Sequence, residues 1–159
     1  MPSRRDVIRM TDEEVQRFLE DSKTIILNSI GPDGVPHPMP MWYGVEDDGA
    51  IVMTTFAKSQ KVRNLERDAR VSLLVEAGEQ YDQLRGVVFY GKAELIRDTE
   101  AVLDVLSRVT GRMGGGAAGD APPEALRDAL RKTAEKRVAI RVRPERVVSW
   151  DHRKLGGVY

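Results

Sequence analysis

Three consecutive residues, Ser59, Gln60 and Lys61, are the first candidates for chemistry in this sequence. They follow the apolar run Ile51–Thr55 and open a segment with helical spacing, so they are expected at the start of a helix. A helix N-terminus has backbone N–H groups without internal partners, and a hydroxyl and an ammonium add donors for an anion. The triplet is therefore a candidate phosphate site.

The same residues also have a purely structural interpretation. Ser59 would then cap a surface helix that exposes Lys61 on its charged face and packs Val62 and Leu65 inward. This segment taken alone leaves both interpretations open.

The elements that must position these residues form a mainly β, α+β chain. A capping box at Thr11–Glu14 predicts a helix through Asp21, and further helices are expected over 98–109 and 124–136. Alternating patterns predict strands at Thr24–Ile30, Val35–Val45, Ile51–Thr55, Val71–Glu76, Gly86–Ile96 and Arg137–Trp150. These six strands, with short antiparallel connections early on, indicate a small barrel with flanking helices in one domain over residues 1–159.

Two segments have unusual composition. Pro36, Pro38 and Pro40 share one face of a strand, and each lacks an amide donor, so this strand is expected at a sheet edge or a rim that faces a ligand. Gly111–Pro123 is rich in glycine and lies between two helices, which predicts a mobile linker and not a phosphate-binding loop.

Composition narrows the class of protein. The chain has 159 residues, 25 basic and 25 acidic side chains and no cysteine, which excludes disulfides and thiolate sites. Met1–Met10 has no apolar region after its arginines, so we expect no signal peptide, no membrane partner and a cytoplasmic location. Arg127–Lys154 is basic but has few stacking aromatic residues, which argues against nucleic acid and leaves its cations as partners for an anionic small molecule.

The sequence contains no conventional catalytic constellation. His37 and His152 are its two histidines, no carboxylate cluster resembles a metal site, and no motif for a nucleophilic serine is present. We therefore expect no metal, assign no catalytic residue, and infer that a bound cofactor carries any chemistry.

Five motifs in order resemble the split β-barrel proteins related to pyridoxamine 5′-phosphate oxidase, which bind flavins and deazaflavins. They are Gly31–Pro38, Met41–Tyr43, Thr54–Leu65, Arg70–Leu74 and Gly86–Ala93. The ending Ser149–Gly156 is similar to the actinobacterial deazaflavin-dependent oxidoreductases of this family. The resemblance implies a six-stranded antiparallel split β-barrel and a homodimer with sites at the subunit interface.

The resemblance also implies the cofactor-binding residues. The backbone of Met39, Pro40 and Met41 would pass along the ring, and Thr54, Thr55, Ser59, Gln60 and Lys61 would hold the ribityl chain and phosphate. The second subunit would contribute Arg85, Trp150 and Arg153.

Departures from the family pattern indicate which cofactor binds. Pyridoxamine oxidases carry arginines at the positions of Met39 and Gln60, so Lys61 is expected to be the remaining cation for the phosphate. This favours a deazaflavin, coenzyme F420, with FMN as the alternative, and it argues against vitamin B6 oxidation. A basic groove is expected to hold the glutamate tail of coenzyme F420, formed by Arg141, Arg143, Arg153 and Lys154.

The expected activity is hydride transfer from the deazaflavin to a small planar or unsaturated organic acceptor. Trp150 or Tyr43 would shield the site from water, and His37, Tyr43 and solvent stay open as proton donors. The alternative is a non-catalytic protein that binds a flavin or a haem-type ligand.

Overall fold

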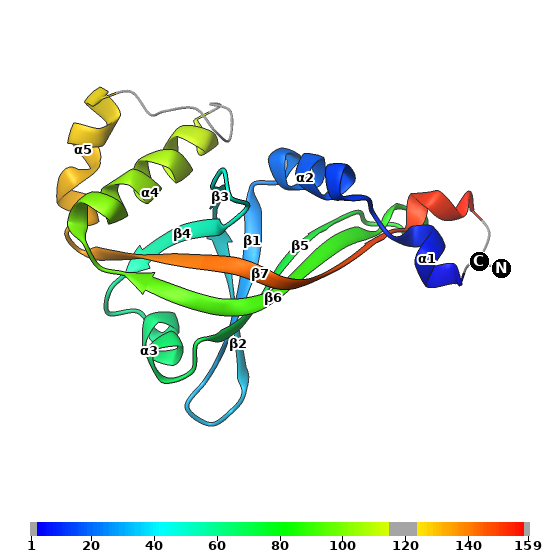
Figure 1. Cartoon of the computed structure of the whole chain (residues 1–159), viewed down its shortest axis with the longest axis horizontal. Helices are drawn as coiled ribbons and strands as arrows, with labels where there is room; N and C mark the ends of the chain where they lie inside the picture. Colours follow the sequence, from blue (N-terminus) through cyan, green and yellow to red (C-terminus); the bar gives the residue numbers. More distant parts are fainter. Residues whose placement is uncertain (1–2, 115–123, 158–159) are drawn as a thin grey trace.

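A single antiparallel sheet forms the centre of the computed structural model, which describes residues 3–114 and 124–157 (Figure 1). Its strands lie in the order β2-β1-β5-β6-β7-β4-β3. Their bounds are β1 Thr24–Ile30, β2 Pro36–Trp42, β3 Gly44–Val45, β4 Ile51–Phe56, β5 Arg70–Ala77, β6 Arg85–Ile96 and β7 Arg137–Asp151. The helices are α1 Arg4–Ile8, α2 Asp12–Asp21, α3 Gln60–Arg67, α4 Thr99–Met113 and α5 Glu124–Ala134, with short 3-10 turns at Tyr81–Gln83 and His152–Leu155. None of the described helices is long and apolar enough to cross a membrane.

The curled sheet and its flanking helices confirm the predicted split β-barrel. The described residues contain seven strands, one more than expected, because the predicted strand Val35–Val45 divides at Tyr43. Tyr43 is fully buried, and its hydroxyl donates a 2.6 Å hydrogen bond to the Leu19 carbonyl. The chain therefore leaves the β1 ladder at Tyr43, and β3 pairs with β4.

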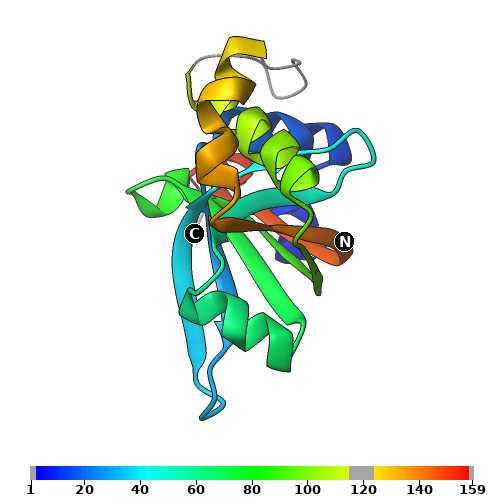
Figure 2. The same cartoon turned by 90° about the vertical axis from the view of Figure 1, so that its left-hand side faces the viewer.

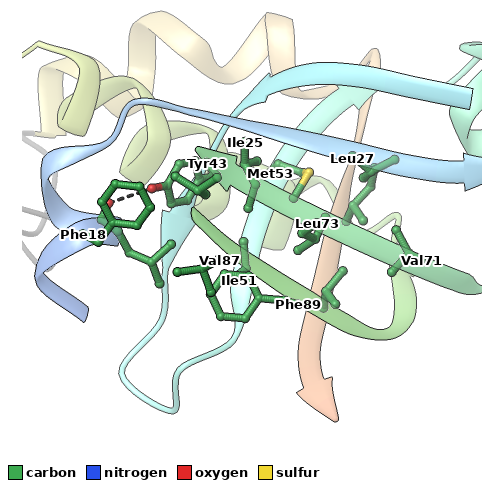
Figure 3. Packing of buried hydrophobic residues seen from close by; sticks show 14 of the residues in the cluster. Phe18, Ile25, Leu27, Tyr43, Ile51, Met53, Val71, Leu73, Val87 and Phe89 are labelled. Carbon is green, nitrogen blue, oxygen red and sulfur yellow. Dashed lines mark hydrogen bonds between the residues drawn. The ribbon is translucent and has the colours of Figure 1, made fainter. Parts of the chain in front are cut away.

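Apolar side chains fill both faces of β4. Met53 points into the barrel interior, where Figure 3 shows it among residues from β1, β5 and β6 such as Leu27, Leu73 and Phe89. Val52 points outward, into a second cluster formed mainly by α4. Because neighbouring strand residues face opposite sides, Thr54 faces outward and Thr55 faces inward. Figure 2 shows α4 and α5 on one side of these strands and α3 on the other.

The proline-rich strand β2 lies at the edge of the sheet, as predicted. Its outward residues Pro36, Pro38, Pro40 and Trp42 are exposed, whereas its inward residues are half-buried. The three prolines leave no unpaired amide donors at their positions, which suits this edge.

The helix α4 ends at Met113, four residues later than the sequence predicted. The predicted linker Gly111–Pro123 is therefore wrong for its first three residues, and residues 115–123 lie outside the described part of the chain. The reason is Arg112, which is 2% exposed and donates hydrogen bonds to the carbonyls of Tyr43 at 2.8 Å and Ser22 at 2.7 Å. These contacts hold the last turn of α4 against the end of α2.

Candidate functional site

Lys61 is buried although it lies in the first turn of α3. Only 8% of its surface is exposed, and its ammonium donates a 3.1 Å hydrogen bond to the Thr55 hydroxyl. Within residues 3–114 and 124–157, no carboxylate pairs with it. Burial lowers the pKa of Lys61, and the charge of Arg137 lowers that pKa further. Because a buried ammonium without a counter-ion is costly, an anion would complete this arrangement.

Ser59 is the N-cap residue of α3, yet its side chain makes no capping hydrogen bond. Its hydroxyl oxygen instead accepts a 3.4 Å hydrogen bond from the Thr55 hydroxyl. Lys61, Thr55 and Ser59 thus form a connected chain of donors beside the free N–H groups of the first helical turn. Neither residue follows the purely structural interpretation, in which Ser59 caps the helix and Lys61 points to solvent.

Asn64 holds α3 against the sheet. Its side chain is fully buried, and its amide nitrogen donates a 3.0 Å hydrogen bond to the Ser29 hydroxyl on β1. The Asn64 amide oxygen accepts a 2.9 Å hydrogen bond from Gln60. Asn64 and Lys61 are three residues apart and so lie on the same face of the helix. The contact with Ser29 therefore keeps Lys61 directed toward the sheet.

A second cation, Arg137, begins β7 directly opposite Phe56 at the end of β4. Its guanidinium carbon lies 4.4 Å from the centre of the Phe56 ring, and its buried Nε atom has no hydrogen-bond partner among the described residues. The next pair of this ladder joins Thr55 to Val138. Lys61 is therefore not alone at this end of β4, contrary to the expectation from the sequence.

A cavity of about 530 Å³ lies between β2, β4 and the helices α4 and α5. It is lined by Thr24, Pro40, Met41, Trp42, Thr54, Leu106, Val109, Thr110, Leu130, Thr133 and Arg137. Apolar walls with a few hydroxyls and one cation are typical of sites for small organic ligands.

The cavity and the donor chain together include the predicted residues Pro40, Met41, Thr54, Thr55, Ser59 and Lys61. Of the residues predicted to act within the same subunit, two fall outside both parts. Met39 is half-buried on β2 and does not line the cavity, and Gln60 is exposed and bonded to Asn64.

Sequence reasoning missed Trp42 and Arg137 as parts of the site. Trp42 is 59% exposed at the cavity wall, and it continues the outward alternation of Pro38 and Pro40, which was the available signal. Arg137 faces the same side of the sheet as Arg141, so the alternation of the strand predicted that its side chain points outward. The alternation could not predict that Phe56 of β4 lies opposite Arg137.

Arg85, Trp150 and Arg153 lie apart from this cavity within one chain. Trp150 is half-buried and packs on Gly86, where an added Cβ would come within 2.3 Å of the indole. Arg153 forms a 2.6 Å ion pair with Asp151. Arg85 lines a second cavity of about 440 Å³, which shares Thr24 and Pro40 with the first. Trp150 therefore has a packing partner in its own chain, which the sequence did not reveal.

The predicted basic groove for a glutamate tail is neutralised in this structure. Each of its four cations pairs with a carboxylate: Arg141 with Glu46, Arg143 with Asp48, Arg153 with Asp151 and Lys154 with Glu14. This expectation does not hold within one chain. Glu46, Asp48 and Glu14 come from distant parts of the sequence that the fold brings beside these cations, whereas Asp151 lies only two residues before Arg153.

Tyr43 is removed from the candidates for shielding or proton transfer. It is fully enclosed in the core, where its hydroxyl is hydrogen-bonded to Leu19, and burial raises its pKa. His37 is half-buried on the inner side of β2, and its Nδ1 atom has no partner among the described residues.

Three solved structures share the fold of this chain. A conserved hypothetical protein, Rv2991, from Mycobacterium tuberculosis is 42% identical over 99% of this chain and 95% of its own, with a TM-score of 0.87. An F420 reductase matches at 23% identity over 83% of this chain and 94% of its own, with a TM-score of 0.61. An FAD-binding protein from Mesorhizobium loti matches at 18% identity over 88% and 92%, with a TM-score of 0.58.

No curated protein sequence matches the chain significantly. The family model described as pyridoxamine 5′-phosphate oxidase matches residues 11–151, which contain all seven strands and the donor chain at Lys61. Because the match covers most of the sequence, the chain belongs to the pyridoxamine 5′-phosphate oxidase-like family of split β-barrels.

Proposed function

We propose that this protein is an oxidoreductase that binds a flavin-type cofactor, with coenzyme F420 as the first candidate and FMN as the second. The observation that carries the proposal is the burial of Lys61 beside two hydroxyls with no carboxylate among the described residues. A phosphate fits this donor set, and the apolar cavity between β2, β4 and the α4–α5 pair fits a planar ring.

Each part of the site would have a separate task. Lys61 and Ser59 would bind the phosphate, and the edge strand at Pro40 and Met41 would support the ring. Trp42 lies at the cavity wall and is exposed, so it would limit the access of water to the ring. When bound in reduced form, the cofactor supplies hydride, and the protein contributes the orientation of an acceptor against the ring face.

Coenzyme F420 remains the first candidate because Met39 and Gln60 replace the arginines that the family resemblance leads us to expect there. The pairing of the four C-terminal cations with carboxylates removes the second argument for coenzyme F420. Titration of the purified protein with each cofactor at matched ionic strength decides between them. Tighter binding of FMN would reverse the order.

The proposal of catalysis needs its own experiment, because a binding protein would pass the titration. The protein with reduced coenzyme F420 or reduced FMN should oxidise it when an enone or a quinone is added. Oxidation at the rate of the free cofactor would show that the protein only binds its ligand.

We further propose that the protein is a homodimer. Five residues on neighbouring strands lie directly opposite one another and form a row across the outer face of the sheet: Pro40, Ile26, Leu74, Val88 and Val148. All five are half-buried or exposed in the single chain. An apolar row of this kind is a suitable surface for a second copy.

The two ends of this row explain how one site could be shared between two chains. Pro40 lies at one end and lines the cavity, and Val148 lies at the other end, two residues before Trp150. In a two-fold dimer whose axis crosses this row at right angles, the row packs against itself in reverse, so the Val148 end of one copy meets the Pro40 end of the other. Trp150, Arg153 and Arg85 of one subunit would then approach the cavity of its partner.

A further inference from the structure

Lys61 and Arg137 lie on either side of the turn that joins β4 to α3. The turn is fixed at its base, because the Ala57 amide donates to the Lys136 carbonyl at 3.1 Å and the Ser59 amide donates to the Phe56 carbonyl at 3.0 Å. Lys61 reaches Thr55 on the inner side of β4, and Arg137 covers Phe56 on the outer side. Both cations therefore border the same end of one strand.

Arg137 differs from the next outward-facing arginine of its strand, Arg141. The guanidinium of Arg141 makes hydrogen bonds of 2.8 and 2.9 Å to Glu46, whereas no described carboxylate pairs with Arg137. The Arg137 guanidinium lies over the Phe56 ring, which offers it no hydrogen-bond acceptor in the ring plane, and its buried Nε atom has no acceptor among the described residues.

Two unfavourable features thus coincide at this turn. A buried donor without an acceptor is destabilising, and two neighbouring like charges repel. An anion between Lys61 and Arg137 would remove both. Arg137 also lines the 530 Å³ cavity, so it joins the cavity to the donor chain of Lys61, Thr55 and Ser59.

We propose that Arg137 is a second anion-binding residue of this site, and that its ligand carries two negative charges at the phosphate end. This inference deepens the proposed function and rests on it for the identity of the ligand as a flavin-type cofactor. The two charges have two possible sources: a phosphate monoester in its dianionic form, as in FMN, or a singly charged phosphodiester with a carboxylate of the glutamate tail, as in coenzyme F420.

The first experiment measures the affinity of the full chain for inorganic phosphate by calorimetry, which does not depend on any cofactor. Arg137→Gln is compared with Lys136→Gln, which removes the same charge from the neighbouring exposed residue. Arg137→Gln should weaken phosphate binding by about tenfold, which is the effect of losing one charge-assisted contact. Lys136→Gln should weaken it by less than about twofold, because an exposed charge that does not touch the ligand is screened by salt. Equal weakening by both variants, or no effect of Arg137→Gln, would overturn the proposal.

A second experiment measures how the affinity for inorganic phosphate depends on pH. Replacing an arginine with a purely structural role would not change this dependence. In the wild-type protein, the affinity for inorganic phosphate should rise as the ligand loses its second proton, and Arg137→Gln should flatten this rise. Arg137→Lys keeps the charge and should restore most of the rise in affinity with pH. An unchanged profile in Arg137→Gln would refute a two-cation site even if the variant had lost affinity through a change in the fold.

Cofactor titrations distinguish the two sources of charge. If the phosphate carries both charges, Arg137→Gln weakens FMN and leaves riboflavin unchanged. If a tail carboxylate carries the second charge, the variant weakens coenzyme F420 more than the same compound without its glutamates. Should neither cofactor bind the wild-type protein, the proposed function fails, while the phosphate experiment still decides whether Arg137 binds an anion.

Discussion

Replacing Lys61 with methionine should weaken phosphate binding without weakening the fold. Methionine keeps most of the length and apolar volume of lysine but removes its charge and its hydrogen-bond donors. A hydrogen bond between charged groups contributes about 1.5–3 kcal/mol. At about 1.4 kcal/mol for each factor of ten, the dissociation constant of the cofactor should rise about 10- to 140-fold.

The effect on stability should have the opposite sign. Lys61 is 8% exposed, and its ammonium has one neutral hydroxyl, at 3.1 Å, as its described partner. Its charge is also disfavoured by burial and by Arg137, as the lowered pKa indicates. The variant loses one hydrogen bond to Thr55 but no longer buries an unpaired charge. Its melting temperature without ligand should therefore be equal to or higher than that of the wild type.

The assay combines cofactor titration with thermal unfolding of the ligand-free protein. Lys92→Met, which removes an exposed lysine on β6, serves as the control and should leave both measurements nearly unchanged. A marked drop in melting temperature with unchanged affinity would refute the reasoning, because Lys61 would then support the fold and not the ligand.

Three further predictions concern pH, stability and assembly. Because burial and Arg137 lower the pKa of Lys61, affinity for the cofactor phosphate should fall as the pH rises through that lowered pKa, and Lys61→Arg should retain affinity at alkaline pH in the same titration. Arg112→Met leaves buried carbonyls at the end of α2 without donors, so it should lower the free energy of unfolding measured in urea by about 2–4 kcal/mol. The control Arg131→Met, at a half-exposed position, should lower it by less than about 1 kcal/mol. A heterodimer of a Lys61→Met chain and a Trp150→Ala chain should bind about one cofactor per dimer while each homodimer binds poorly; no recovery would place each site within one chain.

The sequence by itself determined the local features of this protein. In the capping box, the Thr11 and Glu14 side chains accept hydrogen bonds from backbone amides three residues away, and the β2 prolines remove amide donors at their own positions. Both effects are local, so they could be predicted from neighbouring residues. The alternation in Arg137–Trp150 likewise predicted the inward Ile140 and the outward Arg141. The Ser59–Lys61 triplet indicated an anion site for the same reason, since a helix start has donors wherever it lies.

The tertiary structure decided which charges are paired. Arg141 meets Glu46 across 95 residues of sequence, and the Arg112 guanidinium meets the end of α2 more than 90 residues earlier, so no local pattern could reveal either contact. The same holds for Lys61 and Arg137, which only the β4–β7 ladder brings to one turn. Whether a cation is neutralised or left for a ligand depends on which distant groups share its low-dielectric surroundings, and the fold alone sets those neighbours.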